Sequence, residues 1–206
     1  MFYEPSKGHG LPRDPFKQLV APRPIGWFTT LNEDGSVNVG PYSYFNAVAD
    51  DPPVVMFSAG ARDGVPVKDS ARNAAARGEF VHNMVTWDLR ERMNTTSDEV
   101  DYGIEEAAMA ELELAPSSVV KTPRIAASPA ALECRYLQTL EIPQNGPAGP
   151  NLVVFGEVIG VHIVDAIMQE GRVDLSLVRP IARLGYANYT VVETIFRMLR
   201  PGIKAD

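Results

Sequence analysis

Short runs of β-branched and aromatic residues, separated by turns, fill the region from residue 25 to residue 57. Residues 25–31 (IGWFTTL) predict a strand, and residues 37–44 (VNVGPYSY) predict its antiparallel partner. Residues 34–35 (DG) tolerate the left-handed backbone that a tight hairpin requires, so the two strands should form a hairpin. A loop should follow and end at residues 51–53 (DPP), after which residues 54–57 (VVMF) predict a short buried strand.

The next segment changes to a helical pattern. Residues 68–77 (KDSARNAAAR) predict a helix, because alanine-rich turns favour this conformation. Asp69 or a neighbour can cap its start, and Gly78 can end it. Residues 80–85 (FVHNMV) then predict a strand.

Residues 86–130 predict an insertion made of helix and loop. We expect residues 86–109 to be mainly helical, with a break near residues 95–97 (TTS). Residues 115–129 contain three prolines and predict a loop.

The clearest alternation of apolar and polar residues lies in residues 132–142, which predict a long strand. Its polar face should carry Glu133, and its apolar face is expected to carry Leu132, Cys134, Tyr136, Leu140 and Ile142. Residues 152–163 predict a second long strand, in which Gly156 and Gly160 indicate a bend or a bulge. A last strand is expected within residues 186–192.

Hairpin signals and long strands with two helical segments predict a mainly β fold. The expected architecture is an antiparallel closed barrel with helical insertions, because the regular strand–helix–strand alternation of a nucleotide-binding α/β fold is missing. We interpret residues 1–206 as one domain, with a proline-rich extended lead-in at residues 1–20.

The amino-acid composition excludes several classes of function. The net charge of −7 argues against a nucleic-acid-binding protein, and the single cysteine, Cys134, excludes an intrachain disulfide or a cysteine-based metal cluster. The three histidines are isolated, so no metal site is expected. We expect no secretory signal and no membrane-spanning segment, and therefore a cytoplasmic protein.

Candidate binding chemistry surrounds the start of the predicted helix. A helix start offers unpaired backbone N–H groups and a positive dipole end, so it can hold a phosphate group. The basic and polar residues here are Ser58, Arg62, Lys68, Ser70 and Asn73. A capped, solvated helix start is the simpler interpretation, and the residue types alone do not separate the two.

Residues 40–53 (GPYSYFNAVADDPP) carry aromatic rings beside small polar groups. They can form a tyrosine-rich strand packed on its own barrel, or the wall of a site for a flat ligand. Together with a phosphate site at the helix start, the second alternative would suit flavin mononucleotide (FMN). The chain contains no nucleophile elbow, phosphate-binding loop or dinucleotide fingerprint, so no catalytic side chain is expected.

An ordered series of motifs resembles the flavin reductase-like, FMN-binding split-barrel family, and more narrowly its flavoredoxin-like branch associated with flavoprotein oxygenases. The series comprises Arg-Pro-Ile-Gly, Thr-Thr followed by Asp-Gly, Pro-Tyr-Ser-x-Phe-Asn, Asp-Pro-Pro, Lys-Asp-Ser-x-x-Asn and Gly-Glu-Phe-Val-x-Asn. Residues 180–185 (PIARLG) and Tyr189 resemble the closing segment of the family.

The resemblance implies an antiparallel split β-barrel of Greek-key type that binds FMN near the interface of a homodimer. Ser43, Phe45 and Asn46 would face the flavin ring or ribityl chain, whereas Tyr42 and Tyr44 are interpreted as packing residues. The other residues implied in cofactor binding are Thr29, Ser58, Arg62, Lys68, Asp69, Ser70, Asn73, Arg183 and Tyr189.

The expected activity is that of an NAD(P)H-dependent flavin reductase, which transfers hydride from NADH or NADPH to FMN and supplies reduced flavin to a partner such as an oxygenase. Two alternatives remain: an FMN-bound electron-transfer protein of flavoredoxin type, and a split-barrel binding protein without redox function.

Overall fold

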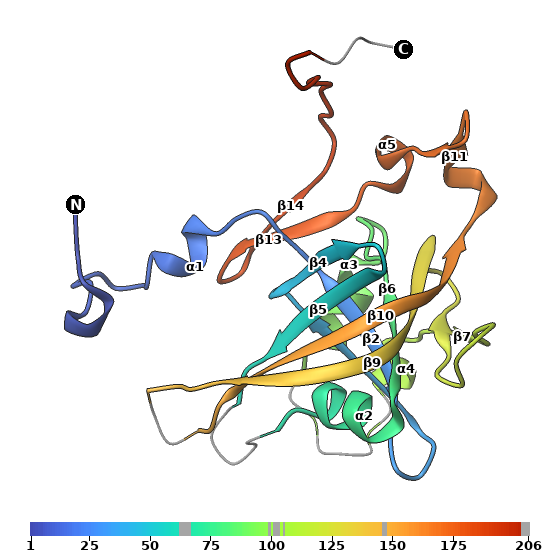
Figure 1. The fold of residues 1–206 in the computed structure, drawn as a ribbon, viewed down its shortest axis with the longest axis horizontal. Helices are drawn as coiled ribbons and strands as arrows, with labels where there is room; N and C mark the ends of the chain where they lie inside the picture. The colour runs from blue at the N-terminus through green and yellow to red at the C-terminus, as the bar shows by residue number, and fades with distance from the viewer. Residues whose placement is uncertain (62–66, 99, 101–103, 105, 146–147, 203–206) are drawn as a thin grey trace.

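The computed structural model describes residues 1–61, 67–98, 100, 104, 106–145 and 148–202. Arg62, one of the implied cofactor residues, lies outside these ranges. The body of the protein is a strongly curved antiparallel sheet of seven strands in the order β3-β2-β6-β9-β10-β5-β4 (Figure 1). These strands are β2 (Gly26–Leu31), β3 (Val37–Tyr42), β4 (Phe45–Asp50), β5 (Pro53–Ala59), β6 (Glu79–Asn83), β9 (Ala130–Ile142) and β10 (Asn151–Ile163).

Smaller elements surround this sheet. The short strands are β1 (Arg23–Pro24), β13 (Ile181–Gly185) and β14 (Asn188–Val191) in one sheet, β7 (Leu114–Ala115) with β8 (Arg124–Ile125), and β11 (Met168–Gln169) with β12 (Arg172–Val173). The helices are η1 (Pro5–Lys7), α1 (Phe16–Leu19), α2 (Asp69–Arg77), α3 (Arg90–Thr95), α4 (Glu106–Met109), η2 (Asp165–Ile167) and α5 (Leu175–Val178). None of the helices among the described residues has the length and apolar character needed to cross a membrane.

The predicted hairpin and the predicted helix are both confirmed. Strands β2 and β3 pair in antiparallel register from Gly26–Tyr42 to Leu31–Val37. Helix α2 ends at Gly78, whose φ of 73° is the left-handed conformation expected at this position. The start of α2 differs from the prediction, because Lys68 occupies the N-cap position and no side chain caps the helix there.

Strand β4 corrects the prediction of a loop between residues 44 and 53. Phe45–Asp50 pairs antiparallel with β5, from Phe45–Phe57 to Asp50–Pro53. β4 lies at the edge of the sheet and is mostly exposed, so its residues need no continuous apolar pattern. Its strand conformation depends on pairing with β5, which local composition does not reveal.

Strands β9 and β10 confirm the predicted irregularities but correct the predicted faces. The ladder shifts register between Phe155 and Gly156, where Leu137 has no partner, and a second shift lies between Val158 and Gly160. A bulge adds one residue and so inverts the alternation beyond it. Beyond this shift both faces of β9 are exposed or half-buried, and Leu140 and Ile142 are 51% and 41% exposed instead of sharing the buried face of Cys134.

The core has two parts, one on each face of β2. Neighbouring residues of a strand point to opposite faces, so Trp27 and Phe28 belong to different clusters. Phe28 lies among Phe57, Phe80 and the alanines of α2, with its ring centroid 4.2 Å from that of Phe57. Trp27 lies among the buried side chains of the insertion and β13, and its Nε1 donates to Thr96 Oγ1 at 2.9 Å.

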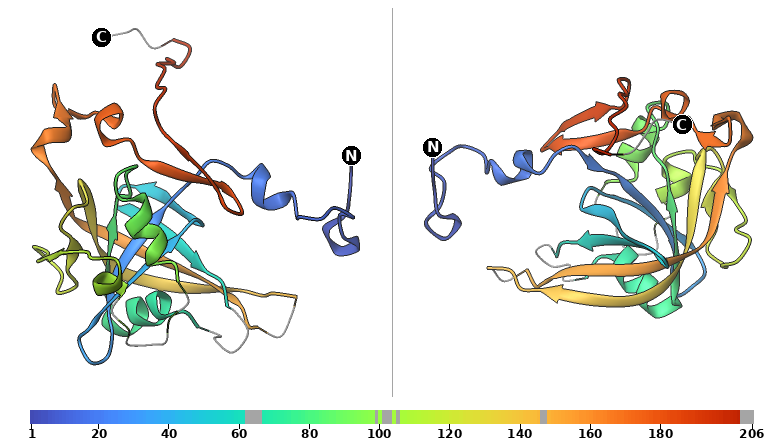
Figure 2. Two further views of the ribbon diagram at one scale, coloured as in Figure 1. Left: turned by 180° about the vertical axis from the view of Figure 1, so that it is seen from behind. Right: turned by 45° about the horizontal axis from the view of Figure 1, so that its top comes forward.

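Both ends of the chain extend away from this body (Figure 2). Residues 1–20 form an arm that contains η1 and α1, and residues 192–202 form a second arm. The arms expose large apolar side chains, including Phe2, Leu19, Phe196 and Met198. Apolar side chains exposed on extended arms are available for contact with another protein surface.

Candidate functional site

A cavity of about 350 Å³ opens beside the start of α2, and we call it the α2 cavity. One side is formed by β3 and the two residues that follow it, and Ser58 at the end of β5 and Gly60 just after it form another part. The start of α2 and the insertion residues 96–98, 100 and Glu106 complete the lining. Four segments far apart in the sequence therefore meet at this cavity.

Five of the implied cofactor residues line the α2 cavity: Ser43, Ser58, Lys68, Asp69 and Ser70. Their hydroxyl groups and the Lys68 ammonium group are hydrogen-bond donors of the kind that bind a phosphate or a ribityl chain. The first backbone N–H groups of a helix lack intrahelical partners, and no side chain caps those of α2. This donor set fits a phosphorylated ligand.

Three acidic residues, Asp69, Asp98 and Glu106, share the described lining of this cavity with the basic Lys68. Asp69 forms an ion pair with Arg72, one turn along α2. Glu106 is buried, and its Oε2 accepts a hydrogen bond from Val39 N at 3.0 Å. Burial raises the pKa of Glu106, while this backbone hydrogen bond lowers it, and the net change is upward. Its carboxyl group therefore opposes an anion less than an ordinary glutamate would.

Tyr42 and Tyr44, interpreted from the sequence as packing residues, also line the α2 cavity. Tyr42 combines both roles, because its ring lies 5.1 Å from that of Phe57 in the core. Burial raises the pKa of Tyr42 to about 12, so its hydroxyl group stays protonated and hydrogen-bonds with Ser70. Glu106, Thr96 and the other insertion residues at this cavity are not predictable from the sequence, because no local pattern distinguishes them.

Two other implied residues, Thr29 and Asn73, lie in the protein interior and do not line the α2 cavity. Thr29 Oγ1 donates to Pro123 O at 2.6 Å. Asn73 Nδ2 donates to Asn32 Oδ1 at 2.7 Å and so ties α2 to the β2–β3 hairpin. Both side chains already have hydrogen-bond partners within the protein.

Phe45 and Asn46 lie on β4, beyond the residues that line the α2 cavity. The Phe45 ring stacks on His82, with centroids 4.5 Å apart and ring planes at 22°. Asn46 is exposed, and its Oδ1 accepts a hydrogen bond from Ala47 N at 2.9 Å. Asn46 is therefore accessible, whereas Phe45 is engaged by the core.

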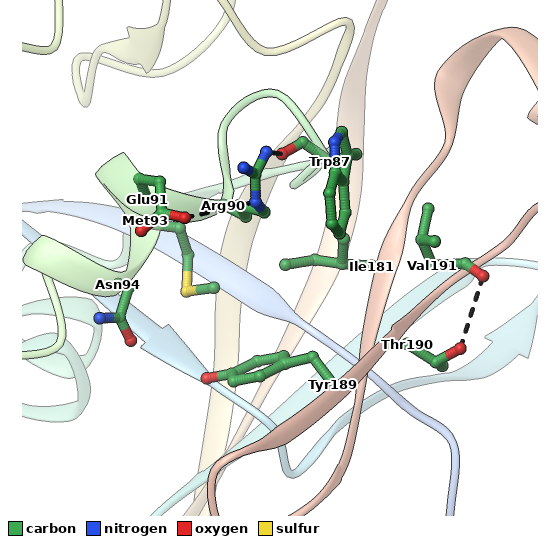
Figure 3. Close-up of a pocket in the computed structure, with 9 residues that line it drawn as sticks. All are labelled: Trp87, Arg90, Glu91, Met93, Asn94, Ile181, Tyr189, Thr190 and Val191. Carbon is green, nitrogen blue, oxygen red and sulfur yellow. Dashed lines mark hydrogen bonds and ion pairs between the residues drawn. The ribbon is translucent and has the colours of Figure 1, made fainter.

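The last two implied residues, Arg183 and Tyr189, lie elsewhere, on β13 and β14. Arg183 Nη1 donates to Tyr189 Oη, and its guanidinium lies 4.4 Å from the centroid of the Tyr189 ring. Tyr189 lines a second cavity, of about 430 Å³, between α3 and the β13–β14 hairpin (Figure 3). We call it the α3 cavity. Of the implied residues, five therefore line the α2 cavity and Tyr189 lines the α3 cavity, whereas the other described ones line neither.

Comparison with known proteins indicates the same family as the sequence motifs. The profile of the flavin reductase like domain matches residues 20–191. An uncharacterized protein of Aquifex aeolicus is 38% identical over 172 residues, which cover 83% of this chain and 85% of the relative.

Solved structures extend the likeness to the whole fold. Nitrilotriacetate monooxygenase component B from Bacillus cereus matches with a TM-score of 0.88 and 26% identity, over 96% of this chain and 98% of the other. The 2-nitrobenzoate 2-nitroreductase NbaA from Pseudomonas fluorescens matches with a TM-score of 0.79 and 30% identity, over 93% and 91%. A putative flavin reductase with a split barrel domain from Shewanella frigidimarina matches with a TM-score of 0.78 and 20% identity, over 90% and 89%. The expected mainly β, split-barrel fold is confirmed.

Proposed function

Because the chain belongs to the flavin reductase-like family, we propose that it binds FMN and transfers hydride to the flavin from NADH or NADPH. The observation that supports this most directly is the convergence of Ser43, Ser58, Lys68 and Ser70 on one cavity at the start of α2. We assign Ser58, Lys68 and Ser70 to the ribityl and phosphate end of the cofactor.

The bound flavin would supply the redox chemistry, accepting hydride from the nicotinamide. The protein then has to bind, orient and stabilise charge, and needs no side-chain nucleophile. Lys68 would supply a point charge for the phosphate, and the first N–H groups of α2 would donate to its oxygens. Ser43 and the exposed Asn46 would be directed to the ring end of the flavin.

We further propose that the protein acts as a homodimer and delivers reduced flavin to an oxygenase. The similarity to a monooxygenase component B supports an oxygenase partner. The exposed apolar side chains of the two terminal arms support contact with another protein surface. Light scattering of the purified protein measures its molar mass in solution and so tests whether it is a homodimer.

The site assignment is tested by titrating FMN and riboflavin into the wild type and the Lys68→Ala variant. Losing one charge-assisted contact should weaken FMN binding by about 1–3 kcal/mol. Riboflavin lacks the phosphate, so its affinity should not change. Lys121→Ala is the matched control, because Lys121 lies outside the α2 cavity. Equal weakening of both flavins would place Lys68 away from the phosphate, and unchanged FMN affinity would remove it from the site.

The activity is tested by following the oxidation of NADH and NADPH with added FMN. Consumption of either nicotinamide supports the reductase. FMN binding without nicotinamide oxidation would instead support the electron-transfer alternative, and no flavin binding at all would contradict both.

A further inference from the structure

We propose that the α3 cavity binds a small planar aromatic carboxylate with a single ring. This inference goes beyond the proposed function, because neither FMN nor a nicotinamide is assigned to this cavity. It is drawn from the shape of the cavity, from the aromatic side chains on its walls and from the donor groups at its rim.

The floor and walls of the α3 cavity are apolar and firmly held. Met93 and Ile181 are 2% and 5% exposed and belong to the core cluster around Trp27. Figure 3 shows them between the Trp87 indole and the Tyr189 ring. The Arg90 guanidinium lies over the indole ring, so the Tyr189 ring supplies the flat aromatic wall of the cavity. A volume of about 430 Å³ lies within the usual range for small-molecule sites. A flat aromatic wall beside the apolar Met93 and Ile181 side chains favours a planar ring.

The rim of the α3 cavity carries a positive group whose position is fixed. Arg90 Nη1 donates to Trp87 O at 2.7 Å, and the Arg90 guanidinium lies 3.9 Å from the centroid of the Trp87 ring. These two contacts hold the guanidinium beside the opening (Figure 3). Little side-chain freedom would be lost when a ligand binds, so the site is preorganised.

Two donor groups at the rim are free to bind a ligand. Among the described residues, Arg90 Nη2 and the side-chain amide of Asn94 make no hydrogen bond. Arg90 Nε lies 3.3 Å from Glu91, but the Glu91 side chain is 79% exposed. Such an exposed ion pair contributes little, so a ligand can compete with it. A carboxylate on the ring offers the acceptor oxygens and the negative charge that match these donors.

The proposal is tested by calorimetric titration of the full-length protein with benzoate, benzamide, benzylamine and cyclohexanecarboxylate. We expect benzoate to bind at one site per chain and the other three to bind at least about tenfold more weakly. Benzamide removes the charge, benzylamine reverses it, and cyclohexanecarboxylate removes the planar ring. The titration requires neither flavin nor nicotinamide, so it can fail while the proposed function holds.

Two variants of α3 locate the site. Arg90→Gln should weaken benzoate binding at least about tenfold and leave the weak benzamide binding unchanged. Arg92→Gln is the matched control, because Arg92 is exposed on the same helix and does not line the cavity. Arg90 is half-buried and Arg92 is exposed, and glutamine keeps much of the arginine stem, so thermal unfolding should remain close to that of the wild type. Three results would overturn the proposal: no benzoate binding, tighter binding of benzylamine, or equal benzoate affinity in the Arg90 variant.

Discussion

Glu133 places a buried carboxylate beneath the loop at residues 117–122, where it accepts four hydrogen bonds. Three come from the backbone N–H groups of Ser118, Val119 and Val120, at 2.6, 2.6 and 2.8 Å. The fourth partner is His162 Nε2, at 2.5 Å. Because Glu133 is fully buried, replacing it leaves these groups without water as an alternative partner.

The loss of stability expected on replacing Glu133 can be worked out from the pKa of its carboxyl group. Burial alone would raise this pKa, but the hydrogen bonds from the loop and from His162 outweigh it and lower the pKa from 4.5 to about 2. Each pKa unit corresponds to about 1.4 kcal/mol, so the ionised carboxylate stabilises the fold by about 3 kcal/mol relative to its protonated form. Because the pKa is lower in the folded protein, the carboxylate stabilises the fold fully at pH values above 4.5, the pKa in the unfolded chain. This stabilisation is lost as the pH falls from 4.5 toward 2.

We therefore expect Glu133→Gln to lower the free energy of unfolding by about 3 kcal/mol at neutral pH. Urea unfolding at a series of pH values measures this, and the gap to the wild type should close as the pH falls from 4.5 to about 2. Glu141→Gln, at an exposed position of the same strand, is the control and should have little effect. A gap that stays constant over this pH range would refute the role assigned to the carboxylate charge.

Three further predictions concern the core. A β-carbon at Gly156 would overlap the Phe80 ring, so Gly156→Ala should lower the unfolding free energy by about 1–3 kcal/mol, and more than Gly160→Ala does. Burial lowers the pKa of His82 from 6.5 to about 4, so the free energy of unfolding should decrease as the pH falls from 6.5 to about 4. His82→Phe should remove this part of the decrease, and a variant with the same pH profile as the wild type would contradict the prediction. Burial raises the pKa of the Cys134 thiol, so a thiol reagent should modify it only after unfolding, and rapid labelling of the native protein would contradict its burial.

Much of the fold was predictable from local patterns. The β2–β3 hairpin, helix α2 with its end at Gly78 and the bulges near Gly156 and Gly160 all agree with the sequence. Each depends on residues close together in the chain, such as a turn dipeptide or a glycine in a left-handed conformation. The edge strand β4 was missed, since its conformation depends on pairing with β5.

The candidate site was predictable only in part. The motif residues Ser43, Ser58, Lys68 and Ser70 meet at the α2 cavity. Asn73 and Thr29, which belong to the same motifs, are instead buried and hydrogen-bonded inside the protein. A motif records which residues occur together in the chain and does not show which way each side chain points.

The sequence by itself determined six of the seven strands of the main sheet, helix α2, the mainly β class and the series of polar residues from which a phosphate site could be inferred. The tertiary structure decided which of those residues share a cavity, and it brought Glu106 from the insertion to the same place. It also reversed the expectation for Glu133, which local alternation assigned to an exposed polar face. The physical reason is that burial and contact between distant residues depend on strand pairing and on the register set by bulges, and these are properties of the whole sheet.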